Sequence, residues 1–182
     1  MNNTLVAIFA IMLSVNLSCG SGRVSVSSDA LAAKGANVAI IGFDMRNKKD
    51  STAVPRVSDE FADALLPSFM EAGFRVIERK KIDLLLKEAE LQASGVVDAD
   101  GAVRFGKIAR VRFVVYGSGL VNPSGGGRDF FLHSVSVKMV DVETGATALA
   151  ASWSGAGLRP PEVAEEIGKD IVKKFKDSPA GR

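Results

Sequence analysis

The chain has 182 residues with one cysteine and one histidine, and its 23 basic side chains nearly balance 21 acidic ones. This length fits one domain, and an apolar fraction of 47% is ordinary for a protein that buries a core. The net charge of +2 gives no sign of a nucleic-acid-binding protein, and a single cysteine excludes an internal disulfide.

The N-terminus has the pattern of an export signal. An apolar run over residues 4–15 ends shortly before the only cysteine, Cys19. The run is shorter than the ~20 residues of a membrane-spanning helix and has the length of the apolar part of a signal peptide. We predict a signal peptide over residues 1–18, cleavage before Cys19 and acylation of the new N-terminal cysteine. Ser18 fits such a site, whereas Asn16 stands where leucine is usual. The alternative is an ordinary signal peptide, cut near the same place, and a soluble exported protein.

Acylation would place the protein in the envelope of a bacterium. Two or three acyl chains hold a protein stably on a membrane, whereas one chain binds only marginally. We expect the anchor at the periplasmic face of the outer membrane. Gly20 agrees with this, because it is not the aspartate that often signals retention in the inner membrane, but it does not by itself select the membrane. Residues 19–36 are rich in glycine, serine and alanine and predict a flexible tether between anchor and domain.

Residues 37–176 carry the patterns of a folded α/β domain. The continuous apolar run over residues 38–43 predicts a strand buried on both faces. A helix is predicted over residues 58–73, with Ser58 as its N-terminal cap. Pro67 lies inside that helix, where it removes a hydrogen bond, so we expect a kink there.

A strand and two helices are predicted next. The strand covers residues 74–78, and an amphipathic helix follows over residues 80–92. The second helix covers residues 98–110, and either Asp98 or Asp100 is expected to cap it.

In the rest of the domain, short alternating runs are separated by turn residues, a pattern that predicts an antiparallel meander. Strands are expected over residues 112–121, 130–142 and 146–154, joined by turns at 122–129 and 143–145.

The last element is predicted to be an amphipathic helix. Pro160 or Pro161 opens it, since proline suits the first turn of a helix. Residues 177–182 are expected to be a disordered tail. An apolar residue at every fourth position forms the predicted buried stripe: Val163, Ile167, Ile171 and Phe175.

Few residues could carry catalysis or hold a metal. His133 shares a predicted strand face with Phe131 and Val135, and no Gly-x-Ser-x-Gly nucleophile motif is present. Residues 98–101 lack the aspartate spacing of a calcium loop, and the glycines at 125–127 are not followed by the Lys-Ser/Thr of a phosphate-binding loop. We predict no catalytic, cofactor or metal site, and therefore no enzyme.

Three blocks in this order resemble a known family. They are Val-Ile-Glu-Arg at residues 76–79, Leu-Leu-Leu-Lys-Glu at 84–88 and Val-Asp-Val-Glu-Thr-Gly at 140–145. Their order and spacing resemble the CsgG-like family of curli-secretion lipoproteins over nearly all of residues 37–155. The resemblance implies one mixed sheet in an α/β sandwich like an anticodon-binding domain, with the element order β-α-β-α-α-β-β-β-α.

The resemblance also implies which relatives this chain is similar to. The ring-shaped channel of the family adds two membrane hairpins per subunit, one where residues 122–129 lie and one after the strand ending near Ser154. Each hairpin needs two strands of ~9–11 residues, and neither insertion is present. The chain therefore resembles the hairpin-free members, which include activators of penicillin-binding proteins and flagella-associated outer-membrane lipoproteins.

The expected function is that of a non-enzymatic, protein-binding adaptor held at the outer membrane by acylated Cys19. Its partners would be envelope proteins of secretion, flagellar or cell-wall assembly. The alternative is a subunit of a ring-shaped, curli-type secretion channel.

Overall fold

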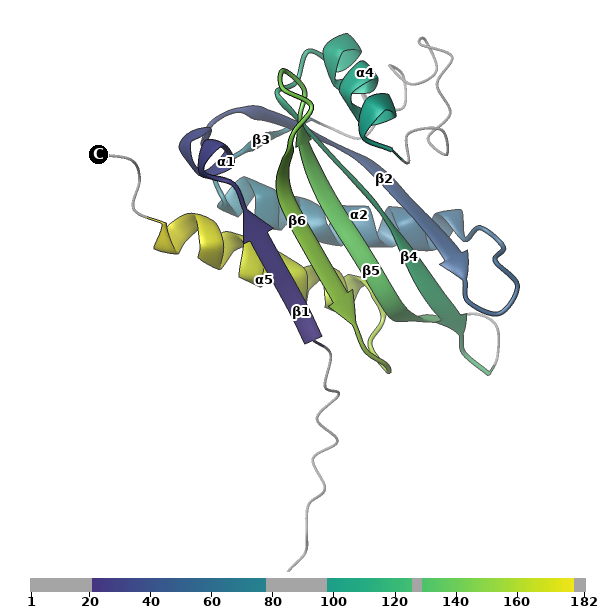
Figure 1. The fold of residues 1–182 in the computed structure, drawn as a ribbon. Coiled ribbons are helices and arrows are strands. Elements are labelled where there is room, and N and C mark those ends of the chain that lie inside the picture. Colours follow the sequence, from purple (N-terminus) through teal and green to yellow (C-terminus); the bar gives the residue numbers. More distant parts are fainter. Residues whose placement is uncertain (1–20, 78–97, 126–128, 179–182) are drawn as a thin grey trace, which may run out of the picture.

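The computed structural model describes residues 21–77, 98–125 and 129–178. They form one six-stranded mixed sheet in the order β1-β6-β5-β4-β2-β3, with helices packed against it (Figure 1). The elements are β1 (Ser21–Val26), α1 (Ser28–Ala32), β2 (Asn37–Asn47), α2 (Pro55–Glu71), β3 (Arg75–Val76), α4 (Ala99–Ala109), β4 (Phe113–Pro123), β5 (Phe130–Asp141), β6 (Thr147–Ser154) and α5 (Pro160–Asp177).

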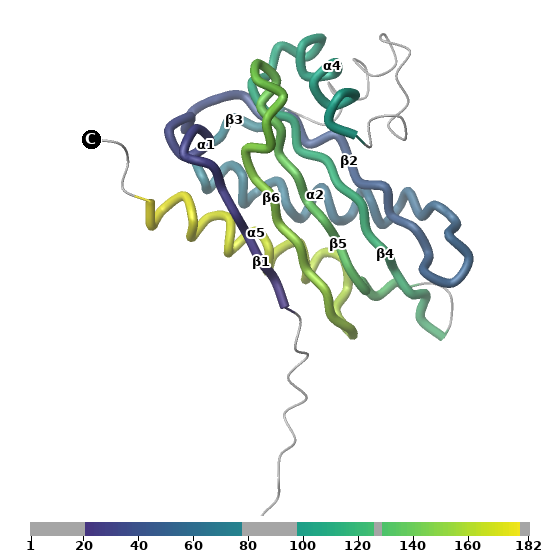
Figure 2. Tube along the Cα trace, in the orientation of Figure 1, coloured from purple at the N-terminus to yellow at the C-terminus, as the bar shows by residue number. Residues whose placement is uncertain are grey.

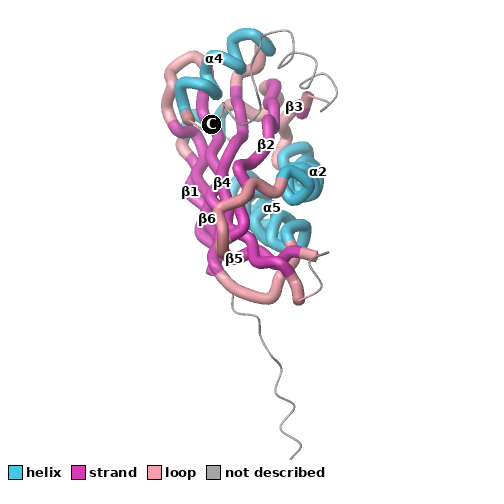
Figure 3. Tube along the Cα trace, turned by 90° about the vertical axis from the view of Figure 1, so that its right-hand side faces the viewer, coloured by secondary structure: helices cyan, strands magenta, loops and turns pink. Residues whose placement is uncertain are grey.

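The two faces of the sheet are covered unequally. Helices α2 and α5 lie side by side along one face, and α4 lies at one end of the molecule (Figure 3). The larger core lies under α2 and α5 and includes Trp153, Phe61 and Phe113. The smaller core lies on the other face, where Phe105 of α4 packs against Val114 of β4. The predicted α/β class with one mixed sheet is thereby confirmed.

The prediction of a tether is wrong for residues 21–36. β1 pairs antiparallel with β6 along its whole length, and Ser27 caps the short helix α1. Figure 2 shows this N-terminal segment as the edge of the sheet beside β6. The strand was missed because β1 lies at an edge and buries only Val24, so it has no apolar run that a sequence pattern could reveal. The domain therefore begins at residue 21 rather than 37.

The start of α2 also differs from the prediction. The helix begins at Pro55, and the N-cap residue that precedes it, Val54, makes no capping hydrogen bond through its side chain. The Ser58 hydroxyl instead accepts a hydrogen bond from the Phe43 backbone N–H at 2.9 Å. That N–H follows a bulge of β2 at Gly42, where the pairing with β4 shifts by one residue. Pro67 lies inside the helix, which continues to Glu71.

The remaining elements follow the predictions closely. α4 begins after the cap Asp98, whose carboxylate accepts the Gly101 N–H at 2.7 Å. Pro160 opens α5, and all four residues of its expected stripe are buried. β4 continues to Pro123, and α5 continues to Asp177, so the expected turn and tail begin later than predicted. The helix expected over residues 80–92 lies outside the described residues.

Candidate interaction surface

One half of the second sheet face is covered by α4, and the other half carries small polar side chains. The pairing of the strands places ten residues of β1, β6, β5, β4 and β2 in two rows across this half, and we call them the serine face. The first row is Ser21, Ser154, Ser134, Leu120 and Arg46, and the second is Arg23, Ser152, Ser136, Ser118 and Asp44.

The serine face is a shallow hollow rather than a closed pocket. All ten residues line a hollow of about 650 Å³ in which hydroxyl groups from four strands face the same side. Ser118 and Ser152 are exposed, whereas Ser134 and Ser136 are half-buried. Each hydroxyl can donate one hydrogen bond and accept two, and none of these side chains is bulky. The surface therefore permits close approach of another backbone.

Charged side chains lie at both edges of the serine face. Arg23 is exposed on the edge strand β1. On β2, the Nε atom of Arg46 lies 2.9 Å from Oδ2 of Asp44, and the Arg46 guanidinium also donates to the Ser51 carbonyl. Because the ion pair neutralises Asp44, the uncompensated charge of the two edges is positive.

A bulge adds apolar groups to this surface. Leu120 of β4 pairs with Ser134, but the next residue, Val121, pairs with Leu132, so His133 is the extra residue of β5. Beyond the bulge Leu132 enters the larger core, and Phe131 pairs with Asn122 on the serine-face side. Phe131 and Leu120 are 36% and 38% exposed, which makes them two of the few large apolar residues at the described surface. A β-bulge is a typical means of redirecting a side chain in this way.

The bulge also corrects one prediction. Phe131 and Val135 were expected to share a strand face with His133, but Phe131 is exposed while Val135 is buried in the larger core. His133 is half-buried, and its carbonyl accepts the Gly155 N–H at 3.1 Å. The strict two-residue alternation used for the prediction cannot register an inserted residue.

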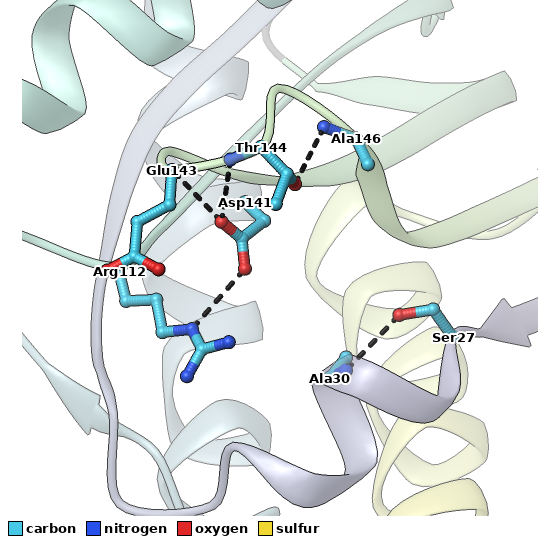
Figure 4. Close-up of polar contacts among 7 residues, drawn as sticks. All are labelled: Ser27, Ala30, Arg112, Asp141, Glu143, Thr144 and Ala146. Atoms are coloured by element: carbon cyan, nitrogen blue, oxygen red, sulfur yellow. Dashed lines mark hydrogen bonds and ion pairs between the residues drawn. The ribbon is translucent and has the colours of Figure 1, made fainter.

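The opposite end of the sheet holds a buried carboxylate. Asp141 is only 4% exposed and accepts hydrogen bonds from the Glu143 and Thr144 N–H groups at 2.9 and 3.2 Å (Figure 4). Its second oxygen accepts from Nε of Arg112 at 3.3 Å, and the Thr144 hydroxyl accepts the Ala146 N–H. These contacts fix the β5–β6 turn and explain the Val-Asp-Val-Glu-Thr-Gly block as a structural motif. The same view shows the Ser27 hydroxyl accepting the Ala30 N–H at the start of α1.

Two ionisable groups beside these surfaces have displaced pKa values. Burial raises the pKa of Tyr116 above its ordinary value, and the Asp98 carboxylate adds to the shift. Tyr116 lies where the α4-covered half meets the serine face. At the start of α5, the Arg159 side chain donates to Glu162 and holds the pKa of that carboxyl below its usual range.

Among the residues that the structure describes, no group of three histidine, cysteine or acidic side chains could hold a metal ion, and none of their helices is long and apolar enough to cross a membrane. Asp98 is occupied as a helix cap, and Asp100 lies in the first turn of the same helix. Cys19, the predicted lipidation site, lies outside the described residues. The serine face was not foreseen, because its residues come from five separate strands.

The fold is similar to that of several solved structures. A PelC dodecamer from Paraburkholderia phytofirmans has a TM-score of 0.53 at 15% identity and covers 88% of this chain and 100% of that chain. Lipoprotein GNA1162 from Neisseria meningitidis has a TM-score of 0.51 at 13% identity, covering 79% and 99%. The LpoB C-terminal domain from Salmonella enterica has a TM-score of 0.50 at 14% identity, covering 69% and 84%.

At the level of sequence, a comparison with curated proteins gives no match. The family model described as the curli production assembly/transport component CsgG matches residues 20–138, which include β1 and the blocks at residues 76–79 and 84–88, while the block at 140–145 follows the matched range. The chain therefore belongs to the CsgG family, as those blocks predicted.

Proposed function

We propose that this protein is a lipid-anchored adaptor of the bacterial cell envelope that binds other proteins and catalyses no reaction. Acylated Cys19 holds it at the periplasmic face of the outer membrane, and its partners belong to secretion, flagellar or cell-wall assembly. The observation that carries the proposal is the serine face, one half of a sheet face on which no described helix packs.

The serine face has the composition of a protein-binding surface. Protein interfaces typically carry about one hydrogen bond per 100–200 Å² and a polar rim. On the serine face the hydroxyl groups supply hydrogen-bond donors and acceptors, and Arg23 supplies positive charge at the β1 edge. Membership of a family described as an assembly and transport component supports the same reading.

Site-specific photocrosslinking tests the adaptor function. A photoreactive phenylalanine analogue is placed at Ser152 in the full chain, expressed in its own bacterium, and at exposed Lys107 of α4 as the matched control. We expect one defined protein adduct from position 152 that is absent from position 107. Introducing Ser136→Arg should abolish that adduct, because the larger charged side chain fills the centre of the serine face. Equal adducts from both positions, or none from position 152, would count against a partner on this surface.

The anchor is tested separately by the intact mass of protein from the membrane fraction. We expect a mass that carries glyceride and acyl chains, and loss of those chains in Cys19→Ser. An unmodified mass with a cut near residue 19 would instead indicate a soluble exported protein.

The alternative of a ring-shaped channel subunit remains a separate proposal. It is motivated by the similar PelC structure, which is a dodecamer. The connections after β4 and β6 span only residues 124–129 and 155–159, which is shorter than two membrane strands of ~9–11 residues each. A monomer in detergent, without conductance in planar bilayers, would eliminate this alternative.

A further inference from the structure

The distance from the anchor to the folded domain is very short. β1 begins at Ser21, so only Gly20 separates Cys19 from the first residue of the sheet. Two residues of fully extended chain span at most about 7 Å. Acyl chains on Cys19 would therefore hold the N-terminal end of β1 within that distance of the lipid headgroups.

Other segments lie at the same end of the sheet as the start of β1. They are the end of β6, the end of β4, the start of β5 and the loop between β2 and α2 (Figure 1). The first row of the serine face crosses this end from Ser21 to Arg46 over four strand spacings, which is about 19 Å. A bilayer that touches Ser21 can therefore also touch the far side of the row.

The far side of that row carries groups suited to a lipid surface. Phe131 and Leu120 are exposed, lie on neighbouring strands and stand in diagonal positions of the β4–β5 pair. Lys48 and Lys49 are exposed in the adjoining loop, and the Lys48 N–H donates to the Val121 carbonyl at the end of β4. Apolar side chains that enter the headgroup region beside cations are the pattern of proteins that lie on anionic membranes.

We propose that this end of the sheet rests on the bilayer, with Phe131 and Leu120 in the headgroup region and Lys48 and Lys49 against anionic lipid. The inference rests on the proposed anchor at Cys19, and its occupant is a lipid surface rather than a protein. The bulge at His133 serves this contact, because it turns Phe131 outward. In this orientation the sheet is roughly perpendicular to the membrane plane. The serine face then points sideways, where a partner protein can reach it.

Tryptophan fluorescence with brominated lipids tests the contact. Wild-type protein supplies the background from Trp153, which is only 1% exposed and belongs to the larger core. Phe131→Trp adds a reporter at the proposed contact, and Thr144→Trp adds the matched control in the β5–β6 turn. The two positions are separated by about ten strand residues, or roughly 34 Å, which is beyond the reach of the bromine atoms.

Two preparations separate a failure of the proposed anchor at Cys19 from a failure of the proposed membrane contact. One is protein from the membrane fraction whose mass has been measured, reconstituted into vesicles that contain anionic lipid. The other is residues 19–182, coupled through Cys19 to a maleimide lipid in the same vesicles. If the mass shows no acyl chains, the proposed function fails, while the coupled preparation still reports on the contact.

We expect the emission added by Phe131→Trp to shift to the blue and to lose most of its intensity with brominated lipid, and the emission added by Thr144→Trp to keep its intensity. Leu120→Trp should behave like Phe131→Trp and guards against a folding defect in one variant. Equal quenching at positions 131 and 144, or no quenching at positions 131 and 120, would overturn the proposal.

Discussion

The two halves of one sheet face have opposite roles, although the same strands run through both. On β4, Val114 and Tyr116 are buried against α4, whereas Ser118 and Leu120, on the same side of the strand, are exposed. On α4, a Cβ atom at Gly106 would overlap Val142, so the helix packs closely on its half. The difference shows that side-chain size and polarity along a strand decide where a helix packs and where the sheet stays open.

Phe105→Ala is the strongest test of the covered half. Phe105 is fully buried beneath α4, so its truncation leaves a cavity. We expect the free energy of unfolding to fall by about 3–5 kcal/mol, measured by urea denaturation. Lys107→Ala on the exposed side of the same helix is the control. A loss below ~1 kcal/mol would show that α4 contributes little to the core.

Asp141→Ala tests the buried carboxylate at the covered end. The substitution leaves the Glu143 and Thr144 N–H groups and the Arg112 guanidinium without their acceptor. The expected destabilisation is about 1–3 kcal/mol. Amide hydrogen exchange of the β5–β6 turn should rise in the variant, while Glu143→Ala should leave it unchanged. Unaltered exchange in Asp141→Ala would contradict the role assigned to this carboxylate.

Tyr116→Phe tests the boundary between the two halves through pH. The pKa of Tyr116 is raised above 10.0, so its neutral form favours the folded state. This contribution is complete below the ordinary pKa and is lost as pH rises through the folded-state pKa. The variant should therefore lose less stability than wild type between pH 9 and the alkaline end of a denaturation series. If wild type and variant lose the same stability over this pH range, the pKa of Tyr116 is not raised in the folded state.

The smallest effect on stability is expected on the open half. Ser118→Ala and Ser136→Ala should change the free energy of unfolding by no more than about 0.5 kcal/mol, because neither hydroxyl supports the core. The same pair of substitutions should weaken the photocrosslink from position 152. Loss of stability together with an unchanged crosslink would reverse the roles assigned to the two halves.

Local patterns were sufficient to predict most of the elements. The four-residue repeat from Val163 to Phe175 identified α5, and the alternation at Val135, Val137 and Met139 identified the buried side of β5. Asp98 was one of the two caps expected for α4. Each of these signals depends on residues that are neighbours in sequence.

The features that were missed depend on contacts between distant segments. Ser58 resembles a helix cap, but β2 supplies a competing N–H from Phe43. β1 is stabilised by pairing with β6 rather than by an apolar face of its own. The serine face exists only because the register of five strands brings its residues into line, which no spacing within one strand could reveal.

The pairing of β1 with β6 also sets an order in time. It joins residues 21–26 to residues 149–154, so the first strand of the domain closes only with a strand made near the end of the chain. A chain synthesised from its N-terminus therefore holds residues 21–26 without their sheet partner until residues 149–154 have been made, so this edge of the sheet is among the last parts of the fold that can form.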